Sequence, residues 1–273
     1  MKYTRLLFIA IFILTGMAGC NIVSPTSDED PPESSGTVFL WIGADKDAYV
    51  SCGRPSGNCP EQDLNFGQEE YLSVAFSSVA IKRVYVHFLI PELPDGTEIQ
   101  EAYLELYHPG KNEDGKTDDI NIPVVRAVSD WSPLDITYAT QPNSFPASYE
   151  FELTLNSQYW SGSTDIVTIV REIFNNPEAY HGFVLYWDEQ SLGIEKGFYS
   201  NNYIDRTADD LAQSPRLLVK IRLLDGKTND DISLPPIPTD NDLEFSGQEV
   251  LMMRYAGGED FPESWNVTKG IRQ

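Results

Sequence analysis

The feature that most constrains this 273-residue chain is an alternation of apolar and polar residues between positions 71 and 223. Successive side chains of a β-strand point to opposite faces, so this alternation predicts strands with one buried face each. Turn residues separate the runs, as at Pro94-Asp95-Gly96 and Ser161-Gly162. The run at 183–187 is apolar throughout, which is typical of a strand covered on both faces.

One segment breaks this pattern. Asp165–Asn176 places four apolar residues at helical spacing, and Pro177 follows its end. Ser163 or Thr164 is the expected cap at its start. One short helix among many strands predicts an all-β fold, namely an antiparallel β-sandwich of jelly-roll type with one short helix.

The N-terminus predicts export and a lipid anchor. Residues 1–19 hold two cations followed by the apolar run 6–14, which is too short to span a bilayer, since that needs about 20 apolar residues. Met17-Ala18-Gly19-Cys20 resembles a bacterial lipobox, which implies cleavage before Cys20 and lipidation of its thiol. The alternative is an ordinary signal peptide followed by a chance cysteine. We expect a protein anchored in the bacterial cell envelope, with the outer membrane or cell surface as its candidate locations.

Composition divides the rest of the chain into three parts. Residues 20–36 are polar and contain Pro and acidic residues, which predicts a disordered tether. Residues 37–224 form the expected β-sandwich domain. Residues 225–273 form an acidic tail that contains Leu234–Pro238 (LPPIP). The sequence leaves open whether this tail packs on the domain.

The other two cysteines predict a disulfide. Cys52 and Cys59 flank a turn-rich loop, and disulfides persist in exported proteins. Free thiols and a metal pair are the alternatives, and the metal pair lacks a neighbouring His or further Cys.

The charge of the chain excludes some partners. Its 42 acidic and 19 basic residues give a formal net charge of −23, which repels nucleic acid and anionic lipid. The phosphate-binding glycine motifs and the HExxH motif are missing from the sequence. The many carboxylates leave open a glycosidase pair, and Arg83, Tyr85 and His87 resemble a lyase set, but nothing singles them out, so we do not expect an enzyme.

A series of short motifs carries a family resemblance. The motifs are Asp47-Ala48-Tyr49-Val50, Asn65-Phe66-Gly67, Leu93–Ile99, Ala102–Leu106, Val128–Ser132, Gln141-Pro142, Gly182–Leu185 and Ser214–Val219. Their order resembles the DNRLRE-type domain, which is related to the carbohydrate-binding modules attached to some alginate lyases. The resemblance covers roughly Val38–Leu223. It implies a non-catalytic β-sandwich that binds polysaccharide or serves as a surface module. Tyr138 stands where that family usually has Trp.

The outward strand positions suggest a glycan-binding face. Aromatic rings stack on sugars, and Arg and Lys bind uronate carboxylates. If their strands are neighbours, the candidates form a cationic, aromatic face suited to alginate or pectin. They are Arg83, Tyr85, His87, Tyr103, Tyr107, Lys220 and Arg222. The alternative is that cross-strand pairs merely cover a solvated sheet, in a monomeric structural or adhesive module without a glycan site.

Other residues have two interpretations each. Trp131 is either a sugar platform or a plug over the core. The polar segment with Tyr199, Asn201, Asn202 and Tyr203 suits sugar hydroxyls, and equally suits a loop that satisfies its own backbone.

Calcium is the one cofactor that the sequence suggests. Asp45 and Asp47 stand two residues apart near the first strand, and residues 112–119 form an acidic loop. Calcium takes six to eight oxygen ligands. A structural Ca²⁺ is therefore an expectation, although no cofactor is required for binding.

Overall fold

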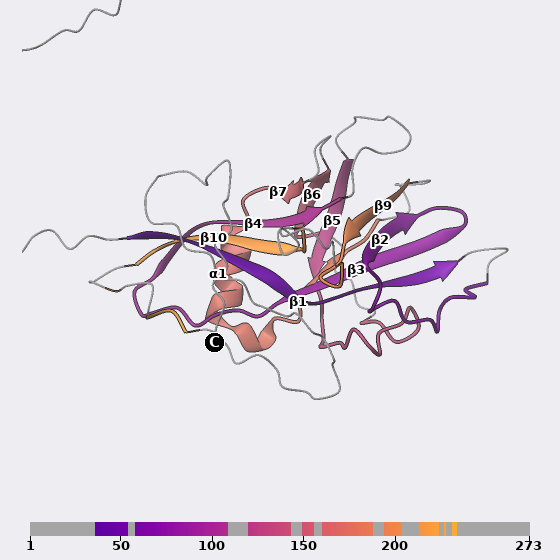
Figure 1. Cartoon of the computed structure of the whole chain (residues 1–273), viewed down its shortest axis with the longest axis horizontal. Coiled ribbons are helices and arrows are strands. Elements are labelled where there is room, and N and C mark those ends of the chain that lie inside the picture. Colours follow the sequence, from indigo (N-terminus) through magenta and orange to yellow (C-terminus); the bar gives the residue numbers. More distant parts are fainter. Residues whose placement is uncertain are drawn as a thin grey trace, which may run out of the picture. The chain divides into compact units, whose positions relative to one another are not determined.

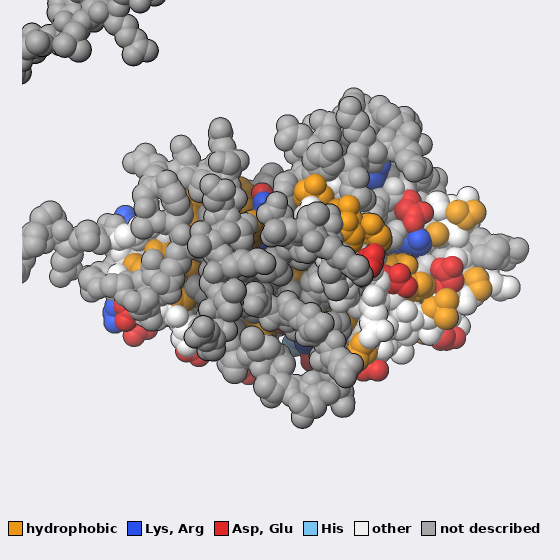
Figure 2. Space-filling model, in the orientation of Figure 1, with side chains coloured by type: hydrophobic (Ala, Val, Ile, Leu, Met, Phe, Trp, Pro, Cys, Tyr) orange, Lys and Arg blue, Asp and Glu red, His pale blue; other side chains and the backbone are white. Residues whose placement is uncertain are grey.

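The computed structural model describes residues 36–53, 58–108, 120–142, 149–155, 160–187, 194–203, 213–223, 227 and 231–233, all within one compact unit, Ser34–Gln273. Figures 1 and 2 show these residues in colour. The strands are β1 (Thr37–Gly53), β2 (Tyr71–Phe76), β3 (Ala80–Phe88), β4 (Glu98–Tyr107), β5 (Ile120–Arg126), β6 (Phe151–Leu155), β7 (Trp160–Ser163), β8 (Phe183–Leu185), β9 (Ile194–Tyr199) and β10 (Arg216–Arg222). The helices are α1 (Val167–Asn175) and the 3-10 turn η1 (Pro177–Ala179).

The strands form one antiparallel sheet that closes on itself. Its order is β1-β10-β4-β7-β6-β5-β8-β3-β2-β9, and a further β1–β3 pairing closes the first eight strands into a barrel. The predicted antiparallel strands with one α-helix are therefore confirmed. The two sheets of a sandwich are not separate here, because hydrogen bonds run continuously around the ring.

Strand β1 closes the ring because it pairs with different neighbours along its length. Thr37–Gly43 pairs with β10, and the segment from Ala44 to Gly53 pairs with β3. The register shifts between Ala44 and Lys46, and such an irregularity bends a strand. Strands β2 and β9 lie outside the ring, attached through the pairing of β2 with β3.

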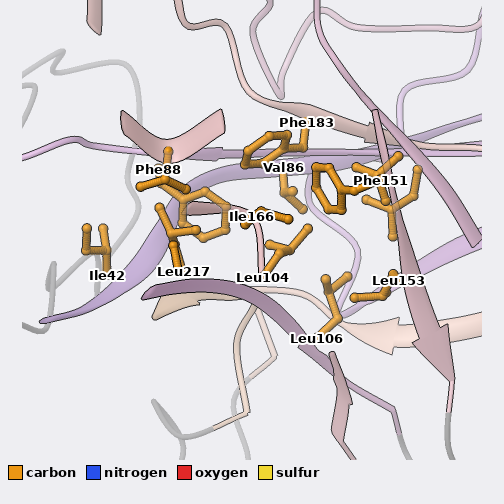
Figure 3. Close-up of a cluster of buried hydrophobic side chains, with 14 of the residues drawn as sticks. Ile42, Val86, Phe88, Leu104, Leu106, Phe151, Leu153, Ile166, Phe183 and Leu217 are labelled. Carbon is orange, nitrogen blue, oxygen red and sulfur yellow. The ribbon is translucent and has the colours of Figure 1, made fainter. Parts of the chain in front are cut away.

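The inward faces of the strands and one face of the helix segment form the main core. The alternation predicted on β4 is observed, since Ala102, Leu104 and Leu106 are buried. Ile166, Val170 and Ile173 bring the helix segment into the same cluster. Figure 3 shows side chains of β3, β4, β8 and β10 converging with Ile166.

The start of α1 differs from the prediction. Ser163 Oγ accepts the Leu104 N–H at 3.0 Å, so it belongs to the β4 edge and not to the helix. Asp165 Oδ1 instead accepts the Val167 N–H at 3.0 Å and the Ala102 N–H at 3.1 Å. One carboxylate thus ties the first turn of α1 to β4. None of the described helices is both long and apolar enough to cross a membrane.

A second cluster covers the outer face of the barrel around β3 and β8. The segment 127–142 folds over this face, and Trp131 lies edge-on to Tyr85 at 5.6 Å between ring centroids. Trp131 Nε1 donates to the His181 carbonyl at 2.8 Å. Trp131 is therefore a buried plug. Its cluster consists of Ala48, Val50, Tyr85, Val125, Ala127, Trp131, Ile136 and Val184.

Two local features hold neighbouring loops in place. A disulfide joins Cys52 and Cys59, as predicted. Gly67 lies so close to segment 127–142 that a Cβ would stand 1.7 Å from the Pro133 carbonyl oxygen. Asn65 Nδ2 donates to the same carbonyl at 2.8 Å, so this approach requires glycine at position 67.

Candidate functional site

The two cations predicted on β10, Lys220 and Arg222, are paired with glutamates of β4, and so is Arg216 on the same strand. Arg216 contacts Glu105 at 2.6 Å and Lys220 contacts Glu101 at 2.8 Å, while Arg222 pairs with Glu98. Each pair stands directly across the two strands in the register. The positive charge of these three side chains is therefore balanced by acids on the neighbouring strand.

The predicted row on β3 is also largely covered. Tyr85 is fully buried, and its hydroxyl donates to Gln141 Oε1 at 3.0 Å. Arg83 donates to the same oxygen at 2.9 Å, with its guanidinium 5.4 Å from the centroid of the Tyr138 ring. Burial raises the pKa of Tyr85. The expectation that Tyr85 faces a glycan is wrong, since segment 127–142 lies over it.

His87 is held by a neighbouring carboxylate. Its Nδ1 lies 2.6 Å from Asp45 Oδ1, and its ring stacks on Tyr180 at 5.0 Å. Tyr103 is half-buried on β4, where its hydroxyl donates to Glu101 at 3.2 Å. The structure thus assigns His87, Tyr103 and the β10 cations to contacts within the protein and does not gather the predicted candidates into one open surface.

Four tyrosines from three strands and a turn form a different surface. Tyr71 on β2 stands opposite Tyr199 on β9, with ring centroids 5.2 Å apart. Tyr203 stacks on Tyr199 at 3.8 Å and lies 5.6 Å from Tyr71. Tyr107, at the end of β4, stacks on Tyr199 at 5.4 Å. We call Tyr71, Tyr107, Tyr199 and Tyr203 the tyrosine patch.

The tyrosine patch is accessible to solvent. Tyr71 is 44 % exposed, and the other three rings are half-buried. Exposed phenol rings have apolar faces for stacking and hydroxyls for hydrogen bonds. Of the four, the sequence placed Tyr107 among the glycan-binding candidates and Tyr199 and Tyr203 in a polar segment that suits sugar hydroxyls, and it did not single out Tyr71. Tyr71 and Tyr199 meet through the register of β2 and β9, which the local pattern does not contain.

Carboxylates surround this side of the molecule. The pKa of Tyr71 is raised by burial and by the neighbouring Tyr199 and Glu70. On β1, burial and the charges of Glu69, Glu61 and Glu195 raise the pKa of Tyr49 to about 12. Glu69 and Glu70 are exposed. Tyr71 of the tyrosine patch therefore stands close to the negative charge of Glu70.

Asp45 and Asp47 accept hydrogen bonds from the protein. Asp47 Oδ1 accepts from Ser200 Oγ, and Asp47 Oδ2 accepts from the Asn201 N–H, both at 2.7 Å. Asp45 bonds to His87. The described part of the chain contains no group of three or more His, Cys, Asp or Glu arranged to hold a metal ion. Both aspartates are thus engaged by donors of the protein, and the calcium expected at them stays a prediction. The acidic loop 112–119 lies outside the described residues.

A hollow lies beside α1. It has a volume of about 290 Å³ and lies between the segment 149–152 and the start of the helix. Tyr149 at its edge is 50 % exposed. Glu150 in its wall is tied to Arg126 at 2.8 Å. This hollow has one exposed ring, in contrast to the four rings of the tyrosine patch.

Comparison with known proteins gives a family. The curated proteins include no match to this chain. The sequence profile of carbohydrate-binding module family 96 matches residues 41–205, which is more than half of the chain. The matched region spans most of the barrel and all four tyrosines of the patch. The chain belongs to carbohydrate-binding module family 96.

Proposed function

We propose that this chain is a non-catalytic module that binds polysaccharide through the tyrosine patch. The observation that carries the proposal is the gathering of Tyr71, Tyr107, Tyr199 and Tyr203 on one accessible surface. Rings that contact one another keep their orientation, so little side-chain entropy is lost when a sugar stacks on them. Membership of a carbohydrate-binding family supports the same ligand class.

The charges favour an uncharged chain over the acidic one first considered. Binding uronates calls for cations that are free to reach carboxylates. Six Lys and Arg side chains are already paired with acids: Lys46, Lys82, Arg126, Arg216, Lys220 and Arg222. Figure 2 shows basic and acidic side chains next to one another on the coloured surface. Glu70 lies next to Tyr71 of the tyrosine patch, and its charge acts on that ring.

The test is affinity electrophoresis of the full chain in gels that contain neutral glucans, galactans, alginate or pectin, with and without calcium. We expect retardation by a neutral polysaccharide, lost in Tyr71→Ala and Tyr199→Ala. Tyr149→Ala is the matched control, since this exposed tyrosine lies beside α1 and outside the patch. It should bind like the wild type.

Each other outcome has a defined meaning. Retardation only by alginate or pectin, still lost in Tyr71→Ala, overturns the preference for uncharged chains and keeps the tyrosine patch. Equal loss in Tyr149→Ala contradicts the assignment of the patch. No binding to any polysaccharide overturns the function and favours the structural or adhesive alternative.

We further propose that the mature protein is held in the cell envelope by lipid on Cys20. The support is the lipobox-like Met17–Cys20 and the apolar run before it. Residues 1–35 lie outside the described residues, as does most of the tail 225–273. Metabolic labelling with a palmitate analogue should mark the wild type and spare Cys20→Ala. Labelling of both proteins would contradict this anchor.

We also propose that the chain is related to DNRLRE-type domains and that it is a monomer. The support is the order of motifs from Asp47 to Val219 and the closure of the ring, which removes free edges from eight strands. Light scattering on the purified full chain should give the mass of one chain. A dimer mass would contradict the monomer.

A further inference from the structure

The turn after β9 carries part of the tyrosine patch. It spans Ser200–Tyr203 and follows Tyr199 directly. The Ser200 N–H donates to the Glu70 carbonyl at 3.0 Å, next to Tyr71, and the Tyr203 N–H donates to the Ser200 carbonyl at 3.1 Å. The geometry of this turn therefore determines how Tyr203 stacks on Tyr199.

A buried carboxylate from the barrel binds this turn. Asp47 lies on β1 and is 2 % exposed. Its two oxygens accept from Ser200 Oγ and from the Asn201 N–H, both at 2.7 Å. Ser200 Oγ in turn accepts the Asn202 N–H at 3.0 Å. Asp47 therefore holds Ser200 and Asn201 directly and Asn202 through Ser200.

The hydrogen bonds between Asp47 and the turn are important because β9, which precedes the turn, lies outside the closed ring. Within the described residues, β9 pairs with β2, and β2 pairs with β3 over Ala75 and Phe76. Asn202 Nδ2 also donates to the Gly67 carbonyl at 3.1 Å, and Asn201 Nδ2 to the Ala44 carbonyl at 3.4 Å. Of these contacts, only those with Asp47 and Ala44 reach β1 of the barrel.

We propose that Asp47 is a positioning residue for glycan binding, which holds the Ser200–Tyr203 turn so that Tyr199 and Tyr203 stay stacked. This inference rests on the proposed function of the tyrosine patch. Burying a carboxylate has a free-energy cost that a well-packed apolar residue would avoid. Burial raises the pKa of Asp47 to about 7, with a smaller contribution from the charge of Asp45, which itself bonds to His87.

Three variants test the role. Asp47→Ala removes both acceptors, and we expect it to weaken glycan binding by about tenfold or more. Asp47→Asn keeps one acceptor for the Asn201 N–H and should restore most of the affinity. Asp45→Ala is the matched control, because it removes another buried carboxylate of β1, whose hydrogen bond is to His87 on β3. It should bind within about twofold of the wild type.

A spectroscopic measurement separates positioning from general stability. In the full chain labelled with 3-fluorotyrosine, the ¹⁹F signals of Tyr199 and Tyr203 are assigned with Tyr→Phe variants. Asp47→Ala should shift or broaden these two signals and leave that of Tyr149 unchanged. If Asp47→Ala does not fold, Ser200→Ala replaces it in the test. Ser200→Ala removes one of the two hydrogen-bond donors to Asp47, and its ¹⁹F signals are compared with those of Asp47→Asn.

The outcomes distinguish this inference from the proposed function. Unchanged ¹⁹F signals and affinity in a folded Asp47→Ala overturn the positioning role. Equal loss in Asp45→Ala overturns it as well, because the effect is then one of stability. If the wild type binds no polysaccharide, the proposed function fails, and the ¹⁹F shift alone decides whether Asp47 positions the rings.

Discussion

Two aromatic regions of this barrel have similar residues and opposite surroundings. Around Tyr85 the rings are buried, and their polar atoms bond to protein groups, as Trp131 does to the His181 carbonyl. In the tyrosine patch, Tyr71 is open to solvent, and its ring contacts the rings of Tyr199 and Tyr203. Segment 127–142 covers the first region. The comparison teaches that the element above an aromatic ring, more than its place on a strand, decides whether it supports the fold or is available to a ligand.

Removing the plug of the covered region should have the largest effect. Trp131→Ala leaves a cavity over Tyr85 and breaks the bond to His181. We expect the free energy of unfolding to fall by about 3–5 kcal/mol, measured by urea denaturation. Trp131→Phe keeps an aromatic ring at this position, so its free energy of unfolding should fall clearly less. A loss near zero for Trp131→Ala would show that this cluster is not a second core.

The pH dependence of stability tests the support beneath the exposed region. Burial raises the pKa of Asp47 to about 7 from its ordinary value of 3.8. Because the folded state binds this proton more tightly than the unfolded state, protonation of Asp47 raises the free energy of unfolding. This contribution is complete below about pH 4 and is lost as the pH rises through 7. Between pH 5 and pH 8, the stability of the wild type relative to Asp47→Asn should fall by on the order of 1–3 kcal/mol. A difference that does not change with pH would show that Asp47 titrates normally.

An exposed ring should separate binding from stability. Tyr71→Ala removes a ring that is 44 % exposed, so we expect a loss of stability of about 1 kcal/mol or less. The same change should weaken binding of a neutral polysaccharide by about tenfold, measured by isothermal titration calorimetry. If Tyr71→Ala destabilises the chain as much as Trp131→Ala does, the contrast between the two regions is wrong.

The smallest effect is expected from the paired cations. Arg222 and Glu98 are 42 % and 43 % exposed, and exposed pairs contribute about 0–1 kcal/mol. Arg222→Ala should therefore change both the stability and the glycan affinity very little. A large loss of affinity for alginate in this variant would revive the basic face that the sequence suggested.

The sequence alone predicted those features of the fold that depend on residues close together in the chain. Alternation located the buried face of β4, helical spacing located α1, and the cysteines of a short loop located the disulfide. Each of these depends on residues close together in the chain.

The site depended on contacts that local pattern does not contain. Alternation predicted that Tyr85 points away from the main core, and it does. Only the folded structure shows that segment 127–142 covers it there. Likewise, Tyr71 and Tyr199 meet through strand register, and the closing β1–β3 pairing depends on the shift near Ala44. Register and coverage are set by tertiary packing, which single-sequence periodicity cannot contain.

The position of β9 outside the ring also has a dynamic consequence. Among the described strands β9 pairs only with β2, so we expect its amides to exchange hydrogen faster than those of the ring. A ligand that bridges Tyr71 and Tyr199 holds the two strands together. Binding of a ligand to the tyrosine patch would then slow hydrogen exchange of the β9 amides. This local protection would report binding without any change in the barrel.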